Sequence, residues 1–204
     1  MTTIVLVRHG QTAWNRLERF RGQADVPLDA TGLAQAEATA RAVAVRWRPA
    51  AIYSSPLSRA MRTAEAIAAS FGLDVQPHPG LLDINYGQWQ GLTPEEVGRR
   101  WPEELRLWYE EPWRARIPGG ESLAEVQARG FAAIEEIAAR HDGDCVVAVA
   151  HTVMNRLILL AAMGLGLERF WRLRQETCAM NVLKAERGEF TIALLNDTCH
   201  LRAT

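Results

Sequence analysis

The stretch Thr-Ile-Val-Leu-Val-Arg-His-Gly, residues 3–10, carries two signals in succession. Residues 3–7 are β-branched or apolar throughout, which is typical of a parallel strand buried on both faces. Arg8 and His9 follow directly, and ligands of open α/β sheets bind beyond the carboxyl ends of the strands. The stretch therefore predicts a central strand that presents an arginine and a histidine to a ligand, although a strand that merely ends in polar residues would show the same pattern.

Strands and helices alternate along the rest of the chain. A second buried strand, 145–150, ends in the same way at His151. We also expect strands at 51–53 and 73–75, helices at 31–47, 57–70, 122–140 and 152–163, and a hairpin of 179–185 with 190–196 that turns at Arg187-Gly188. This alternation predicts an α/β fold, a three-layer α/β/α sandwich with a mostly parallel central sheet.

Residues 93–118 differ from their surroundings. They hold Trp101, Trp108, Tyr109 and Trp113 among charged residues and prolines. We interpret this segment as a mainly helical, lid-like insertion over the sheet's edge. Because no linker, internal repeat or low-complexity tract is visible, residues 1–204 are expected to form a single domain.

Composition excludes several classes of protein. Apolar residues make up 48% of the 204 and charged residues 23%, so the chain can bury a sizeable core and is neither disordered nor fibrous. A net charge of -1 argues against a nucleic-acid partner. No segment has the length of a membrane span or the pattern of a signal peptide, so we expect a cytoplasmic protein with no membrane partner.

Two strands of one sheet that each end in a histidine favour a functional site over coincidence. Alone, His151 would be interpreted as a residue near a helix start whose ring bonds to the backbone; paired with His9, it is a catalytic candidate. Arg59 adds a cation to the first turn of another helix, where free backbone N–H groups also attract anions. The alternative is that Arg59 is an ordinary solvated charge on the surface. Arginines at such positions suit phosphate, which they bind through a bidentate fork.

Further motifs accompany these residues. They are Gln11-Thr12 with Asn15, Arg21-Gly22-Gln23, residues 54–60 (Ser-Ser-Pro-Leu-Ser-Arg-Ala), Tyr86-Gly87-x-Trp89-x-Gly91 and Gly119-Gly120-Glu121-Ser122. Together with Arg8-His9-Gly10 and His151, they resemble the histidine phosphatase superfamily in its phosphoglycerate-mutase-like branch, over about residues 3–200. The resemblance implies that His9 attacks phosphorus and becomes a phosphohistidine. It also implies that no metal or cofactor takes part, and that the phosphoryl group is held by Arg8, Asn15, Arg59 and His151.

One catalytic position departs from the family pattern. The general acid is usually a glutamate four residues before the glycine of the Tyr-Gly-x-Trp segment, and here that position is Asp83. Aspartate is shorter by about 1.5 Å, and a misplacement of about 1 Å can cost roughly a hundredfold in rate. The resemblance assigns the proton donor to Asp83; the alternative is that Asp83 is only a loop residue and that the acid lies elsewhere.

A narrower resemblance points to the metal-independent phosphoserine phosphatases. It rests on residues 108–112, His151-Thr152-Val153, Phe170-Trp171 and the ending 195–201. The implied substrate-binding positions are Gln11, Thr12, Arg21, Gly22, Tyr86, Thr152 and, near the C-terminus, His200. Those enzymes carry a histidine where this chain has Tyr86, which argues against a strict preference for phosphoserine.

The sequence thus predicts a metal-independent phosphomonoester hydrolase. Its expected partner is a small, polar phosphorylated metabolite, with phosphoserine as the leading candidate. Two alternatives stay open: phosphoryl transfer of the cofactor-dependent phosphoglycerate mutase type, and a catalytically weak protein that binds a phosphorylated ligand. A metal-binding protein that uses His9, His151 and His200 is a further hypothesis. A homodimer is also left open.

Overall fold

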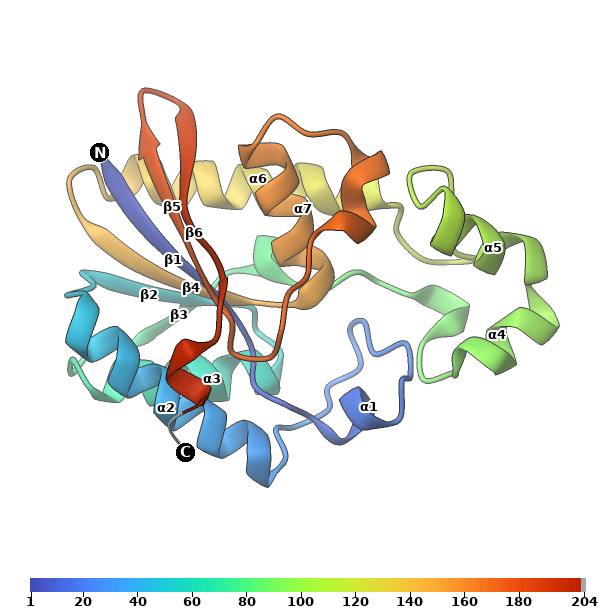
Figure 1. Ribbon diagram of the computed structural model, residues 1–204, viewed down its shortest axis with the longest axis horizontal. Coiled ribbons are helices and arrows are strands. Elements are labelled where there is room, and N and C mark those ends of the chain that lie inside the picture. Colours follow the sequence, from blue (N-terminus) through green and yellow to red (C-terminus); the bar gives the residue numbers. More distant parts are fainter. Residues whose placement is uncertain (203–204) are drawn as a thin grey trace.

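The computed structural model describes residues 1–202 of the chain. Its centre is a six-stranded sheet in the order β3-β2-β4-β1-β5-β6 (Figure 1). The strands are β1 (Thr2–Arg8), β2 (Ala51–Ser54), β3 (Val75–Pro77), β4 (Cys145–Ala150), β5 (Met180–Glu186) and β6 (Glu189–Asp197). The first four in this order pair in parallel, whereas β5 and β6 pair antiparallel. The predicted α/β fold with a mostly parallel sheet is confirmed.

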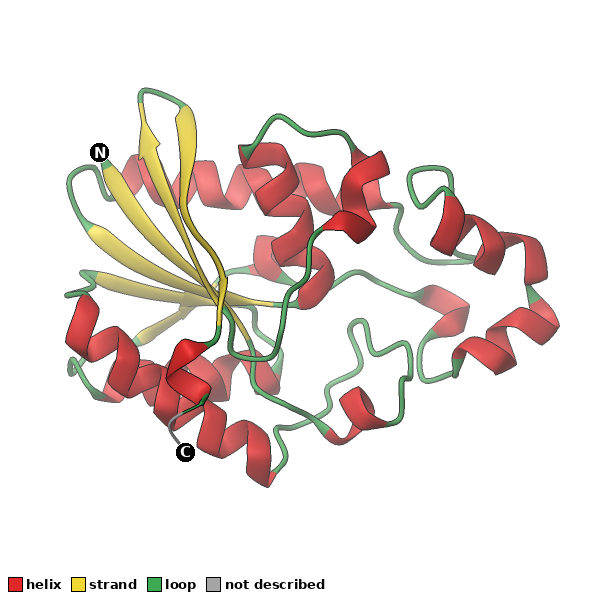
Figure 2. Ribbon diagram, viewed as in Figure 1, coloured by secondary structure: helices red, strands yellow, loops and turns green. Residues whose placement is uncertain are grey.

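Helices cover both faces of the sheet (Figure 2). One face carries α2 (Ala30–Arg46) and α3 (Ser58–Ala69), and the other carries α6 (Leu123–Arg140) and α7 (Thr152–Ala162). Because successive side chains of a strand point to opposite faces, Val5 and Val7 join the core beneath α2 and α3, while Ile4 and Leu6 join the core beneath α6 and α7. β1 is buried on both sides, which is why its sequence is an unbroken apolar run.

The segment 93–118 contains two helices, α4 (Pro94–Arg100) and α5 (Pro102–Glu110). They lie beyond the carboxyl ends of the parallel strands (Figure 1). The cause is Trp108, which is 2% exposed and packs edge-on against Tyr86 and Trp89. This buried aromatic anchor fixes the insertion above the end of the sheet where ligands of such folds bind.

Shorter elements complete the chain. They are α1 (Ala13–Arg16) and the 3-10 turns η1 (Pro79–Leu81), η2 (Gly87–Trp89), η3 (Leu167–Arg172) and η4 (Cys199–Leu201). The strand expected at 73–75 begins only at Val75, because Gly72 turns at φ 65° and the N–H of Leu73 still closes α3. The turn at Arg187-Gly188 is confirmed, with the two positive φ values of a tight hairpin. Within residues 1–202, no helix is long and apolar enough to cross a membrane.

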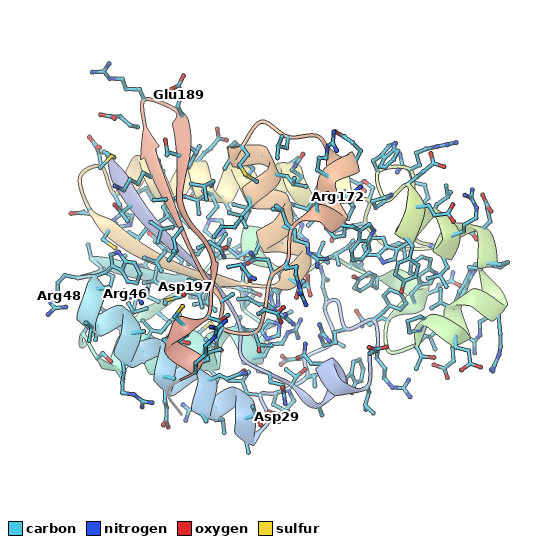
Figure 3. The ribbon with its side chains drawn as sticks, in the orientation of Figure 1. Asp29, Arg46, Arg48, Arg172, Glu189 and Asp197 are labelled. Atoms are coloured by element: carbon cyan, nitrogen blue, oxygen red, sulfur yellow. The ribbon has the colours of Figure 1, made fainter. Side chains whose placement is uncertain are left out.

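The loop after β1 touches the start of α2 at a distance that only glycine allows. Asp29, labelled in Figure 3 at the start of this helix, accepts the N–H of Gly32 at 2.9 Å. A Cβ on Gly32 would lie 2.1 Å from the carbonyl oxygen of Gln11, and one on Gly10 would lie 2.5 Å from that of Gly32. The backbone that follows His9 is therefore held against α2.

We expect Gly32→Ala to lower the free energy of unfolding by about 1–3 kcal/mol, the usual cost of forcing a methyl group into a packed interior. This cost should exceed the gain in helix propensity of about 1 kcal/mol. Equilibrium urea unfolding measures the change. Glu37→Ala, on the exposed face of the same helix, is the control and should stay within about 0.5 kcal/mol. An unchanged stability of Gly32→Ala would contradict the packing argument.

Candidate active site

Four buried side chains meet beyond the carboxyl ends of β1 and β4. His9 follows β1 and His151 follows β4, and the parallel register sets their rings side by side with centroids 5.1 Å apart. Arg59 comes from the first turn of α3 and Asp83 from the loop after η1. All four residues are at most 5% exposed. Two strand ends, the first turn of α3 and the loop after η1 therefore bring together two histidines, an arginine and a carboxyl group.

His9 is held as a neutral ring with one free nitrogen. Its Nδ1 lies 2.7 Å from the carbonyl oxygen of Gly10, and because a carbonyl only accepts, Nδ1 carries the proton. Burial lowers the pKa of His9 well below its usual 6.5, and the cations of Arg59 and Arg8 lower it further. The lone pair stays on Nε2 at neutral pH, which is what a nucleophile requires.

His151 faces Asp83 across a gap that is too long for a hydrogen bond. Its Nδ1 is 3.9 Å from Oδ2 of Asp83, and among the described residues this buried nitrogen has no hydrogen-bond partner. Its Nε2 lies 2.7 Å from Oγ of Ser55. When the Ser55 hydroxyl donates to Nε2, Nδ1 holds the proton and can donate it to an oxygen of a phosphoryl group.

Asp83 has the environment of a carboxyl group that can keep its proton. Burial raises the pKa of Asp83, although Arg59 and Arg21 counteract this. Oδ1 accepts the N–H of Ile84 at 3.0 Å, while Oδ2 is 3.7 Å from Nη2 of Arg59. A perturbed carboxyl group at the edge of a cavity is a candidate general acid.

Arg59 also organises the loop in front of it. Its Nη1 donates to the carbonyl oxygen of Ala24 at 2.7 Å, and its Nη2 donates to that of Gly22 at 2.6 Å. Gly22 adopts φ 48°, and a Cβ there would lie 2.6 Å from the carbonyl oxygen of Ile84. Arg59 thus gives two donors to the backbone and acts on the site through its remaining N–H groups and its charge.

Arg8 is positioned by the loop that precedes β5. Its Nη1 donates to the carbonyl oxygen of Gln175 at 2.6 Å. The side chains of Gln175 and Asn181 exchange amide hydrogen bonds at 2.8 and 2.9 Å. Asn196 joins them, because its N–H donates to Asn181 and its Oδ1 accepts the N–H of Glu176, both at 2.8 Å. This amide network of Gln175, Asn181 and Asn196 connects the end of β6 to the guanidinium of Arg8.

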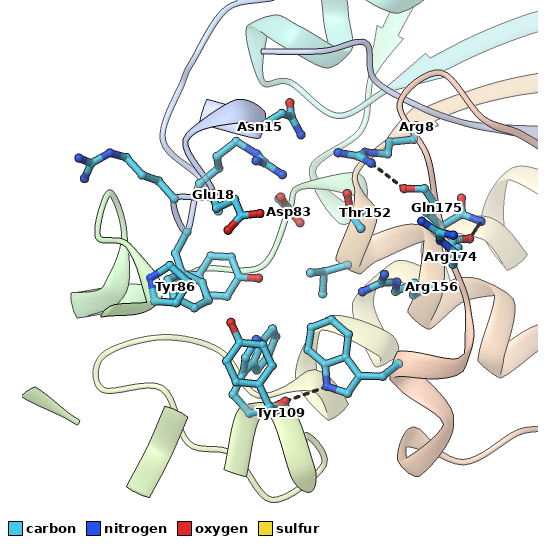
Figure 4. A pocket seen from close by; sticks show the side chains of 18 of the residues that line it. Arg8, Asn15, Glu18, Asp83, Tyr86, Tyr109, Thr152, Arg156, Arg174 and Gln175 are labelled. Atoms are coloured by element: carbon cyan, nitrogen blue, oxygen red, sulfur yellow. Dashed lines mark hydrogen bonds between the residues drawn. The ribbon is translucent and has the colours of Figure 1, made fainter. Parts of the chain in front are cut away.

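A cavity of about 480 Å³ opens in front of these groups (Figure 4). Its size lies in the range of small-molecule sites. The charged residues that line it, among those the structure describes, are Arg8, Arg19, Arg21, Arg156 and Arg174 against Glu18, Asp83 and Glu176. The excess of positive charge favours an anionic ligand. Within residues 1–202, no group of three His, Cys, Asp or Glu side chains could hold a metal ion.

Most predicted site residues lie at this cavity. Those that line it are Arg8, Asn15, Arg21, Gly22, Asp83, Tyr86 and Thr152. His9, Arg59 and His151 are buried beside Asp83. The amide oxygen of Asn15 accepts the N–H of Thr12 at 2.9 Å, which leaves its NH2 group able to donate to a ligand.

Gln11 and Thr12, predicted to bind substrate, do not line the cavity. The side chain of Gln11 donates to Oδ2 of Asp29 at 3.1 Å. Thr12 is fully buried, and its hydroxyl donates to the amide oxygen of Asn15 at 2.9 Å. Their side chains face the start of α2 and the side chain of Asn15, so they support the site from behind.

His200, predicted to bind substrate, does not line the cavity, and that prediction is wrong. Its Nε2 lies 3.0 Å from Oγ1 of Thr39 on α2, on which η4 packs (Figure 1). Just before η4, Asn196 turns at φ 51° and Asp197 pairs with Arg46 of α2 at 2.8 Å (Figure 3). This turn and ion pair direct the C-terminal segment onto α2. Residues 203–204 lie outside the described residues.

Several residues around the cavity are not identified from the sequence, and three of them contact the site's key groups. Arg156 follows His151 by five residues and shares a helix face with Thr152, so helical periodicity could have indicated it. Trp171 lines the cavity from η3 and was noted only as part of a motif. Gln175 carries no sequence signal, because it holds Arg8 through its backbone carbonyl.

We expect the free energy of unfolding to fall as the pH drops below about 6.5. Burial, followed by the charge of Arg59, lowers the pKa of both His9 and His151. Between the folded and unfolded pKa values the unfolded chain therefore binds more protons, and stability rises with pH. Each histidine contributes at most about 1.4 kcal/mol per pH unit. Asp83 has the opposite effect: because burial raises its pKa, its contribution to stability falls as the pH rises above its usual pKa of 3.8.

Urea unfolding between about pH 5 and pH 7 measures this slope. His9→Gln removes one titrating group and should make the slope shallower. Equal slopes for the variant and the wild type would show that His9 does not titrate differently in the two states.

The chain is similar to known proteins in sequence and in fold. The family model for the histidine phosphatase superfamily (branch 1) matches residues 4–198. Phosphoserine phosphatase 1 of Hydrogenobacter thermophilus is 38% identical over 201 residues, or 98% of this chain and 95% of that protein. The metal-independent phosphoserine phosphatase of Arabidopsis thaliana is 40% identical over 162 residues, 78% and 68% of the two chains. The solved structure of Bacillus stearothermophilus YhfR is 28% identical with a TM-score of 0.94, covering 98% of this chain and 100% of that one. The chain belongs to the histidine phosphatase superfamily and is a phosphatase.

Proposed function

We propose that this phosphatase hydrolyses phosphomonoesters through a phosphohistidine at His9 and needs no metal ion. The observation that carries the proposal is the environment of His9. Gly10 holds the Nδ1 proton, so the free Nε2 lies beside His151 in the field of Arg8 and Arg59. A neutral imidazole among cations can attack a phosphoryl group that those same cations bind.

The reaction divides into two steps that exchange one proton. In the first, Nε2 of His9 attacks phosphorus in line, the bond to the ester oxygen breaks, and the leaving alkoxide takes the proton of Asp83. In the second, water attacks phosphorus, its proton returns to the Asp83 carboxylate, and inorganic phosphate leaves neutral His9 behind. The same carboxyl group thus serves as general acid and then as general base.

Fixed cations supply the charge that a metal ion would otherwise provide. The transferring phosphoryl group spreads negative charge over its equatorial oxygens. Arg8 and Arg59 are the cations beside His9, His151 adds a neutral hydrogen-bond donor, and Arg21 lines the cavity in front of them. Because the protein holds these groups in place before the substrate arrives, little reorganisation is needed during the reaction.

Phosphoserine is our leading candidate substrate. The phosphoserine phosphatases of Hydrogenobacter thermophilus and Arabidopsis thaliana are 38% and 40% identical to the chain. The excess of arginine in the cavity also suits a small anion. Tyr86 argues for a broader substrate range, because a phenol donates one hydrogen bond but does not become a cation as histidine can.

We expect a phosphate label on His9 during turnover. Rapid acid-free quenching with a ³²P-labelled substrate should yield a phosphoenzyme that is labile to acid and stable to base, and His9→Ala should abolish both the label and the activity. EDTA should leave the rate nearly unchanged. A label on another residue, or an EDTA loss that magnesium restores, would overturn the proposal. Transfer of the label to a second metabolite rather than to water would instead support a mutase.

Asp83 should matter most for poor leaving groups. Asp83→Asn should slow phosphoserine hydrolysis by about a hundredfold or more but p-nitrophenyl phosphate much less, because nitrophenolate leaves without a proton. Asp83→Glu should keep or raise the rate, since it restores the reach that is usual in the family. Steady-state kinetics on both substrates tests this. Equal losses on the two substrates in Asp83→Asn would mean that Asp83 only positions the substrate.

A further inference from the structure

Arg156 lies on α7, one helix turn after Thr152. α7 begins at Thr152, directly after His151, so Arg156 is about 7.5 Å further along the helix axis. Helical side chains lean toward the N-terminus, which brings the guanidinium back over the cavity. Figure 4 shows Arg156 reaching into the cavity on the side opposite Tyr86.

Aromatic rings hold the guanidinium of Arg156 in place. Its Cζ lies 5.2 Å from the ring centroid of Phe170 and 5.0 Å from that of Trp171. Trp171 is itself fixed, because its Nε1 donates to the carbonyl oxygen of Trp108 at 2.9 Å. A cation–π contact gives the guanidinium no oxygen acceptor, so its N–H groups remain available to one.

No described residue accepts a hydrogen bond from Arg156, and its Nε is buried without a partner. The other described arginines of the cavity are engaged. Arg8, Arg19 and Arg21 donate to backbone carbonyls, and Arg174 is 3.3 Å from Glu176. A guanidinium that is held by aromatic rings, faces a cavity and has no described hydrogen-bond acceptor is arranged for a ligand that brings its own oxygens.

We propose that Arg156 forms a second anion subsite, which binds the carboxylate of a phosphomonoester substrate while the phosphoryl group lies at His9. The inference rests on the proposed hydrolysis at His9 and assigns its substrate class. The two parallel N–H groups of a guanidinium edge match the two oxygens of a carboxylate. Burial raises the pKa of Tyr86 across the cavity, so its hydroxyl keeps its proton and can donate to the same carboxylate. Arg156 thereby supplies the cation that Tyr86 does not.

The test compares two substrates that differ only in the carboxylate, O-phosphoserine and O-phosphoethanolamine. The wild type should prefer phosphoserine. Arg156→Gln should raise the KM for phosphoserine by about tenfold to a hundredfold, the loss expected for a charge-assisted pair of hydrogen bonds. The KM for phosphoethanolamine and the kcat for p-nitrophenyl phosphate should change little. Arg156→Lys should fall between the wild type and Arg156→Gln, because it keeps the charge and loses the fork.

Arg174→Gln is the matched control. It removes one positive charge from the same cavity at a side chain that is 83% exposed. It should therefore raise the KM for both substrates by a similar, small factor. Equal effects of Arg156→Gln on both substrates, with an unchanged thermal unfolding midpoint, would overturn the inference. The inference would also be overturned if Arg156→Gln lost more affinity for a bisphosphate than for phosphoserine.

A second pair of substrates separates this inference from the assignment of phosphoserine. If the wild type does not hydrolyse phosphoserine, 3-phosphoglycerate and glycerol 3-phosphate replace the first pair. A preference for 3-phosphoglycerate that disappears in Arg156→Gln would support the carboxylate subsite even though phosphoserine is excluded. No preference for the carboxylated member of either pair would overturn the subsite, while His9 labelling would still test the hydrolysis independently.

Discussion

The parallel pairing of β1 with β4 is the constraint on which the active site depends. The N–H of His9 donates to the carbonyl oxygen of Ala150 at 3.0 Å, directly before His151. On its other side β1 pairs with β5, and the N–H of Arg8 donates to the carbonyl oxygen of Ala179 at 3.1 Å. A slip of one residue would turn these side chains to opposite faces of the sheet. Backbone hydrogen bonds of the sheet therefore set the geometry of the nucleophile.

Concentrated positive charge is the second constraint, and it has two effects. Arg59 is fully buried and Arg8 is 7% exposed. Buried cations without full compensation destabilise a fold, and a bound phosphate offsets this cost. The same field holds the pKa of His9 below its usual range, after burial itself. In the proposed mechanism, one arrangement of charge thus binds the phosphoryl group and keeps His9 neutral. The fold maintains this arrangement by tying Arg59 and Arg8 to backbone carbonyls.

A site residue can be placed from the sequence when the residues that fix its position lie near it in the chain. His9 and His151 were predictable because each ends an apolar strand, and the edge at which such strands end is common to the whole sheet. The family resemblance supplied Asp83, which no periodicity indicates. The place of His200 was not predictable from its own segment, because it depends on an ion pair between Asp197 and Arg46, 151 residues apart in the chain.

The hydrogen bond that positions Arg8 could not be predicted from the sequence, for a related reason. Gln175 binds Arg8 through a backbone carbonyl, and any residue type carries that group. Its position depends on Asn181 and Asn196, which lie on β5 and β6 and reveal their role only when the two strands pair. Arg156 is an intermediate case. The helix period places it on the face of Thr152, but only the tertiary structure shows that it packs on Phe170 and Trp171 and that its Nε has no partner among the described residues.

The two departures from the family pattern act together on substrate choice. The carbonyl oxygen of Asp83 accepts from Gln23 and Arg129 at 3.1 and 2.9 Å, so its backbone is not free to move and compensate for the short side chain. The leaving oxygen must then approach the acid, which a small alcohol can do more readily than a bulky one. Tyr86 packs edge-on against Trp108 and makes the facing wall rigid. In the proposed mechanism, size is therefore selected at Asp83 and Tyr86, and recognition by charge is left to Arg156.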